Sequence, residues 1–163
     1  MVSKRLANVE GHRRKLLVIV DDSPECDRAI TYAALRAERT GGLLDMLFVI
    51  APGDFQHWLG VEEIMRAEAR EAADAALATY VEKAKSLADI TVETVVREGS
   101  LREELLNLIE EDQDIAILVL AAGDRSDGPG PLVSSLAGKG SSFPIPVTVV
   151  PCHISDDDIR GVV

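Results

Sequence analysis

The stretch IAILVLAAGDRSDGPGPLVSS, residues 115–135, decides the fold of this chain. Its first six residues, Ile115 to Leu120, are all apolar, which is typical of a strand buried on both faces of a parallel sheet. A glycine-rich loop follows, and then a place where a short helix begins. Buried strand, glycine loop and helix start form the arrangement in which α/β proteins hold phosphate groups. The candidate phosphate-binding residues are Gly123, Gly128, Gly130, Ser134 and Ser135.

The same loop also fits an ordinary connection between a strand and a helix. It carries neither the dinucleotide pattern G-x-G-x-x-G nor the phosphate-loop pattern G-x-x-x-x-G-K-[ST]. Asp124 and Asp127 place negative charge where phosphates would lie. Both interpretations therefore stay open on the motif alone.

Strand and helix patterns alternate along the rest of the chain. The predicted strands cover residues 16–20, 43–50, 90–96, 115–120 and 147–150. Ser23 and Ser100 are predicted N-caps, Ser100 with Glu103 in a capping box. A helix is predicted over 61–87, with an apolar stripe at helical spacing made of Val61, Ile64, Met65, Ala69, Ala72, Ala76, Tyr80, Ala84 and Leu87. This order predicts an α/β fold with parallel strands and helical crossovers. We expect one domain, residues 15–151, between a flexible tail (1–14) and an acidic tail (152–163).

Composition and charge exclude several classes of function. The net charge of −11 argues against nucleic acid and anionic membranes as partners, because both require a basic surface. The N-terminus has no apolar run of the kind that a signal peptide needs, and the longest run, around residues 115–122, is too short for a membrane span. Cys26 and Cys152 form no disulfide framework, and neither they nor the histidines show metal-ligand spacing. We expect a cytoplasmic protein without a metal site and without a recognisable set of catalytic residues.

The residues after the first predicted strand are the second candidate group. Asp21, Asp22 and Ser23 follow this strand directly. In an open parallel sheet, ligands bind at the carboxyl ends of the strands where the winding reverses. If the first strand is central, these residues face the glycine loop across that crevice. Asp21 would then accept a hydrogen bond from a hydroxyl or amino group, although a capping role in a turn is the more ordinary explanation.

The chain resembles the universal stress protein family over about residues 15–151. The resemblance rests on LLVIVDDSPECDRAI (16–30), TGGLLDMLFVI (40–50) and FPIPVTVVP (143–151). It implies an open, three-layer α/β fold of the adenine nucleotide α-hydrolase type, with five parallel strands in the order 3-2-1-4-5. It also implies a homodimer formed through the last strand, Val147–Val150.

The resemblance further implies a ligand. Many members of the family bind ATP, and others that lack the binding signature do not. By position, Asp21 and the backbone of Val49 match the adenine contacts, and Gly123 matches the first loop glycine. The remaining pattern, G-x2-G-x9-G-[ST], is altered, because Ser126 stands three residues after Gly123 and the final pair is Ser134-Ser135.

Three functions therefore remain open. The first is a dimeric stress-response module that binds ATP or AMP, with Mg²⁺ if the ligand is ATP. The second is the same dimer without a nucleotide, acting on protein partners whose identity the sequence does not give. The third is a slow nucleotide hydrolase, which the lack of a base near the loop disfavours.

Overall fold

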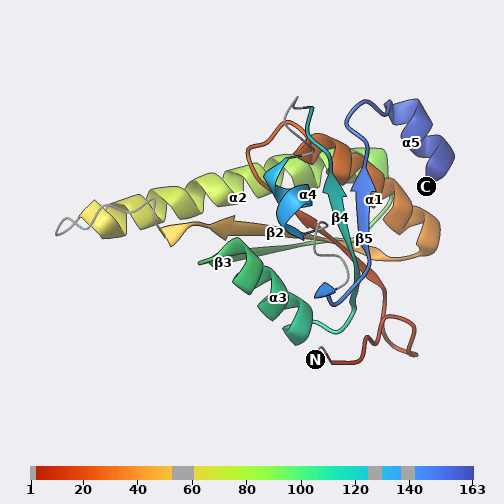
Figure 1. The fold of residues 1–163 in the computed structure, drawn as a ribbon, viewed down its shortest axis with the longest axis horizontal. Coiled ribbons are helices and arrows are strands. Elements are labelled where there is room, and N and C mark those ends of the chain that lie inside the picture. The colour runs from red at the N-terminus through yellow and green to blue at the C-terminus, as the bar shows by residue number, and fades with distance from the viewer. Residues whose placement is uncertain (1–2, 53–60, 125–129, 137–141) are drawn as a thin grey trace.

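The computed structural model describes residues 3–52, 61–124, 130–136 and 142–163 of the chain. Strands and helices alternate along it (Figure 1). Their order is β1 (Lys15–Ile19), α1 (Cys26–Thr40), β2 (Leu43–Ile50), α2 (Val61–Leu87), β3 (Val92–Glu98), α3 (Leu101–Glu111), β4 (Ile115–Ala121), α4 (Pro131–Leu136), β5 (Val147–Val150) and α5 (Asp156–Val162). None of these helices is long and apolar enough to cross a membrane.

The five strands form one parallel sheet in the order β3-β2-β1-β4-β5, which confirms the predicted fold class. β1 is central, with Leu17 paired to Asp45 of β2 on one side and to Leu118 of β4 on the other. The chain proceeds outward from β1 through β2 to β3 and then crosses to β4. The winding therefore reverses between β1 and β4, where open sheets of this kind bind ligands.

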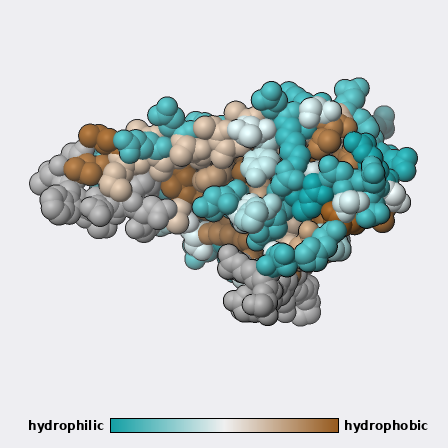
Figure 2. Space-filling model, turned by 90° about the horizontal axis from the view of Figure 1, so that it is seen from above, coloured by the Kyte–Doolittle hydropathy of each residue, from teal (hydrophilic) through white to brown (hydrophobic). Residues whose placement is uncertain are grey.

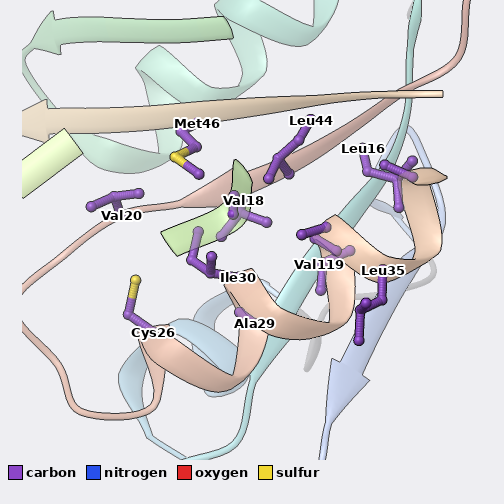
Figure 3. Close-up of a cluster of buried hydrophobic side chains, with 14 of the residues drawn as sticks. Leu16, Val18, Val20, Cys26, Ala29, Ile30, Leu35, Leu44, Met46 and Val119 are labelled. Carbon is purple, nitrogen blue, oxygen red and sulfur yellow. The ribbon is translucent and has the colours of Figure 1, made fainter. Parts of the chain in front are cut away.

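Helices cover both faces of the sheet and give three layers (Figure 1). On one face, Leu16, Val18 and Met46 pack with residues of α1, α2 and α5, and Figure 3 shows the part of this core beside α1. On the other face, Leu17 and Leu118 pack with residues of α3 and α4. Successive strand residues point to opposite faces, so a strand covered on both sides needs an unbroken apolar run.

Two predicted helix starts differ in detail from the structure. α1 begins at Cys26, after the predicted Ser23, and its N-cap is Glu25. Ser23 instead donates to the Asp21 carboxylate from its amide (3.0 Å) and its hydroxyl (2.5 Å), since a carboxylate two residues earlier forms a local turn. Ser100 is the N-cap of α3, as predicted, but its side chain makes no capping hydrogen bond.

The apolar stripe predicted along α2 is only partly correct. Of the predicted stripe residues, Ala84 is buried, and Met65, Ala69, Ala76 and Tyr80 are partly buried against the core. The buried Ala73 and Leu77 lie outside the predicted stripe. Ile64 and Val61, at the start of the helix, are 60% and 39% exposed. This end of α2 projects past the body of the fold, so little of the domain lies beneath it (Figure 1).

Both terminal segments fold against the domain. Arg5 donates to the carbonyl oxygens of Ile109 (2.5 Å) and Asp112 (3.1 Å), which lie at the end of α3. The last carbonyl groups of a helix have no hydrogen-bond partners within the helix, and here the Arg5 guanidinium group donates to them. The C-terminal segment forms α5, in which Ile159 is buried in the core beside α1. The described part of the expected flexible N-terminal tail, residues 3–14, is therefore held against the domain, and the acidic C-terminal tail contains a packed helix.

Candidate functional site

A cavity of about 370 Å³ lies at the carboxyl ends of β1 and β2. Its size falls in the range of small-molecule sites. The walls are mostly apolar and come from the strand ends, from α2 and from the start of α3. The lining residues are Ile19, Val20, Asp21, Asp22, Phe48, Val49, Ile50, Ala51, Ala69, Ala72 and Leu101. The two aspartates are the charged groups among them.

Three residues singled out from the sequence meet at this cavity. Asp21 and Asp22 follow β1 directly, and Val49 lies near the end of β2. The parallel ladder between β1 and β2 brings these strand ends to the same edge of the sheet. Asp21 Oδ1 accepts two hydrogen bonds from Ser23, which fixes the orientation of the carboxylate. A carboxylate has about four acceptor positions, so Asp21 keeps capacity for a ligand.

None of the described residues of the glycine loop is among the residues that line this cavity. A Cβ atom placed on Gly130 would lie 3.8 Å from the amide nitrogen of Gly123, so the two ends of the loop approach each other closely. Gly130 has a φ of +100°, a conformation that favours glycine. Gly128 lies outside the described residues. Ser134 and Ser135 are exposed on α4, which has only six residues.

The carboxylate of Glu25, which no sequence motif indicates, lies beside this loop. Glu25 Oε1 would be 3.4 Å from a Cβ atom placed on Gly130. Glu25 lies at the start of α1, and the fold alone brings it to the loop that follows β4. Asp22 and Asp124 are two further acids near the same strand ends, and none of the described residues that line the cavity is basic. The electrostatic environment therefore opposes a highly charged phosphate chain.

Comparison with known proteins places the chain in a family. A sequence model described as the universal stress protein family matches residues 12–151. The chain belongs to the universal stress protein family. Among curated proteins, none matches this chain.

Solved structures of other universal stress proteins share the fold. The protein from Lactobacillus plantarum is 22% identical, with a TM-score of 0.67 over 84% of this chain and 97% of that one. A universal stress protein in complex with cAMP is 18% identical, with a TM-score of 0.61 over 85% and 96%. A family protein from Arabidopsis thaliana with AMP bound is 16% identical, with a TM-score of 0.57 over 88% and 94%.

This universal stress protein has a second cavity, of about 410 Å³, between α2 and the ends of β2 and β3. Three arginines line it, but each has an acidic partner. Arg66 pairs with Glu98 (3.2 Å), Arg97 with Glu111 (2.5 Å) and Arg70 with Asp74 (3.5 Å). Paired guanidinium groups attract an anion less strongly than free ones, so we favour the cavity beside Asp21 as the functional site.

Cys26, at the start of α1, is buried and is not a nucleophile in this environment. Its side chain is 4% exposed, and its Sγ lies 3.7 Å from the carbonyl oxygen of Ile19. Burial raises the pKa of the thiol, which keeps it protonated at neutral pH. Cys26 lies on the buried side of α1, within the hydrophobic core.

Proposed function

We propose that this universal stress protein binds an adenine nucleoside or a nucleotide with few phosphates in the cavity beside Asp21. The observation that supports the proposal is the meeting of Asp21 and Val49 at one mostly apolar cavity. Apolar walls suit the faces of a purine ring, and the Asp21 carboxylate suits its exocyclic amino group. Two universal stress proteins of the same fold have been solved with cAMP and with AMP.

The phosphate side of the site limits the choice of ligand. Glu25 lies beside Gly130, and Asp22 lines the cavity. Like charges repel, so each added phosphate charge lowers the affinity. We therefore expect cAMP or AMP to bind with higher affinity than ATP. For ATP, bound Mg²⁺ would supply part of the missing positive charge, and the described residues of the site do not fit the triphosphate without it.

Replacing Asp21 with asparagine should weaken AMP binding about tenfold, the effect of losing one hydrogen bond of roughly 1.4 kcal/mol. The asparagine oxygen can still accept from Ser23 and keep the turn. Its amide group, however, would face the amino group of adenine as a second donor. Isothermal titration calorimetry with AMP measures the change.

The matched control is Ser23→Ala, which removes the hydroxyl bond to Asp21 but leaves the carboxylate. AMP affinity should change less in this variant than in Asp21→Asn. Absence of binding heat for the natural chain at about 1 mM AMP, which corresponds to roughly −4 kcal/mol, would reject the nucleotide proposal. Equal losses in the two variants would show that the turn matters and the ligand contact does not.

We infer a binding role rather than hydrolysis. The described residues that line the cavity include no serine, cysteine, histidine or lysine. A hydrolase needs a group that positions or activates water, and Asp21 is already held by Ser23. Release of ADP from ATP by the purified protein, lost in Asp21→Asn, would overturn this inference.

The two free cysteines support a reducing compartment, for which we propose the cytoplasm.

We propose that the protein is a homodimer that pairs through β5. This four-residue strand lies at the end of the sheet order, next to β4 alone. An exposed strand edge offers unpaired backbone groups to a second copy of the chain. Val149 of β5 is 38% exposed, which is high for a valine in a strand.

Replacing Val149 with lysine should convert the dimer to a monomer at micromolar concentration, because two facing copies would bring like charges together. Light scattering coupled to size exclusion gives the mass. Thr94→Lys is the matched control, since Thr94 is exposed on the opposite edge strand, β3, and this variant should stay dimeric. A monomeric natural chain would contradict the proposal.

A second function has one observation in its favour. The projecting end of α2 exposes Ile64 and Val61, and Figure 2 shows hydrophobic surface there. Such a surface suits a module that acts through protein partners without a nucleotide. The calorimetric titration with AMP separates the two proposals, because this one expects no binding heat.

A further inference from the structure

Three side chains of types that can bind a metal lie close together at the carboxyl ends of β4 and β5. Asp124 follows β4, and Cys152 and His153 follow β5. The amide of Ala122 donates to the carbonyl oxygen of Val150 (2.9 Å), which holds the two strand ends side by side. One ligand atom from each of Asp124, Cys152 and His153 lies within 4.8 Å of the other two. The fold thus assembles a carboxylate, a thiol and an imidazole that lie far apart in the sequence.

The distance between the His153 imidazole and the Asp124 carboxylate is longer than an ordinary hydrogen bond. His153 Nε2 lies 3.4 Å from Asp124 Oδ1, beyond the usual 2.7–3.2 Å. In another histidine–aspartate pair of the chain, His12 Nδ1 lies 2.7 Å from Asp114 Oδ1. Two ligands on one tetrahedral ion, each bonded at about 2.0–2.1 Å, are separated by about 3.3 Å. The spacing of His153 and Asp124 therefore matches two ligands of a shared ion.

We propose that Asp124, Cys152 and His153 bind a zinc ion. A thiolate and an imidazole favour Zn²⁺ over Mg²⁺ or Ca²⁺, which prefer oxygen ligands. Three protein ligands leave the fourth tetrahedral position for water. Asp124 and His153 have side chains that are 77% exposed, so they can adjust their rotamers around the ion. Cys152 is half-buried, which gives the cluster one ligand with a more restricted position.

A second cluster of potential metal ligands differs from this one, because a lysine of the protein already neutralises it. Asp45, Glu93 and Asp112 also approach one another closely. There the ammonium group of Lys15 contacts Asp112 (2.6 Å) and Glu93 (2.7 Å), so a side chain of the protein already provides the cation. No basic residue has an ion pair with Asp124 among the described contacts except His153, which is itself a potential ligand.

The test uses the full chain, free of any affinity tag, reduced and treated with a chelator. Cobalt is the probe, because Co²⁺ takes the place of Zn²⁺ and shows thiolate charge-transfer absorption when a cysteine binds it. We expect one Co²⁺ per chain with this absorption, displaced by added Zn²⁺. Cys152→Ser should abolish the absorption, and His153→Ala and Asp124→Asn should each weaken Zn²⁺ binding about tenfold or more. The measurement contains no nucleotide, so it is independent of the proposed function.

Two control variants make the result specific. Cys26→Ser changes the other cysteine, which is buried, and should keep the absorption. His12→Ala removes the histidine of the closely hydrogen-bonded pair and should keep full Zn²⁺ affinity. Cobalt binding without thiolate absorption, or absorption that persists in Cys152→Ser, would overturn the proposal. Half an ion per chain would also overturn it, because the ion would then bridge two copies.

Discussion

A chain with Asp45 replaced by asparagine should be more stable than the natural chain at neutral and higher pH. Asp45 lies in β2 with only 1% of its surface exposed, and its Oδ1 atom has no hydrogen-bond partner among the described residues. A buried carboxylate without full compensation strongly disfavours its charged form. Asparagine has nearly the same shape and never carries the charge. We expect a gain of roughly 2–4 kcal/mol above about pH 7.

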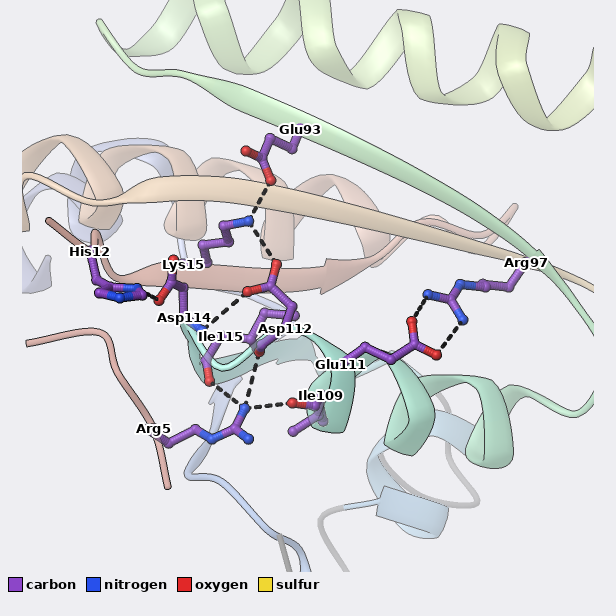
Figure 4. A network of polar contacts seen from close by, with 10 residues as sticks. All are labelled: Arg5, His12, Lys15, Glu93, Arg97, Ile109, Glu111, Asp112, Asp114 and Ile115. Carbon is purple, nitrogen blue, oxygen red and sulfur yellow. Dashed lines mark hydrogen bonds and ion pairs between the residues drawn. The ribbon is translucent and has the colours of Figure 1, made fainter. Parts of the chain in front are cut away.

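Burial and the neighbouring charges together make the ionised form of Asp45 unfavourable in the folded protein. Burial is the main cause that raises its pKa, from the ordinary 3.8 to about 7, while Lys15 lowers it. Figure 4 shows the Lys15 ammonium group between Glu93 and Asp112, which compete for the same cation. These two carboxylates also repel a charge on Asp45 and raise its pKa further.

The pH dependence follows from the direction of this shift. Between about pH 4 and 7 the folded protein holds the Asp45 proton that the unfolded chain has released, so Asp45 makes stability fall as the pH rises. Above about pH 7 both states have lost the proton and this effect is constant. Urea unfolding should therefore show the advantage of Asp45→Asn growing by about 2 kcal/mol between about pH 5.5 and 8.

The control for this prediction is Glu93→Gln, which neutralises a carboxylate that forms an ion pair with Lys15. The Glu93 side chain is 46% exposed, so its charge costs little in the folded state. This variant should show no comparable gain in stability with rising pH. Parallel stability profiles for the natural chain and Asp45→Asn would contradict the role assigned to Asp45.

The central strands β1 and β4 were predictable from the sequence because each contains an unbroken apolar run, whereas the order of the strands was implied by the resemblance to the universal stress protein family. β1 and β4 are covered on both faces, and this burial leaves little room for polar residues. The packing of the termini was harder to predict. Arg5 stabilises the end of α3 through a contact about a hundred residues away in the chain, which no local pattern reveals. The C-terminal helix had a local signal, since Ser155 caps the amide of Asp158 ahead of the apolar Ile159.

The candidate site was predictable only where it depends on strand ends. Asp21 and Val49 meet because parallel strands end at one edge of the sheet. The effect of Glu25 depends on the path of the loop after β4, and the sequence does not specify that path. The approach of Cys152 and His153 to Asp124 likewise follows from the pairing of β4 with β5. Spacing along the chain could not indicate a metal site, because the ligands come from separate segments.

Replacing Glu25 with lysine should raise the affinity for ATP by roughly 2–3 kcal/mol, or about 30- to 150-fold. Glu25 Oε1 lies beside Gly130, close to the backbone that would meet a phosphate chain. The substitution removes a repulsive charge and adds an attractive one, and ATP carries more charge than any other ligand considered. Adenosine has no phosphate, so its affinity should stay within about twofold of the natural value. Calorimetric titrations with both ligands measure this difference in selectivity.

The comparison needs a variant with the same change in net charge elsewhere, because the chain carries a net charge of −11. Asp89→Lys serves this purpose, since Asp89 is exposed and precedes β3 at the opposite edge of the sheet. Screening by salt limits the effect of a distant charge to a small part of that expected for Glu25→Lys. Equal gains in ATP affinity for the two variants would mean that net charge, and not the position of Glu25, controls binding. A gain confined to Glu25→Lys would identify this carboxylate as the group that selects against the triphosphate.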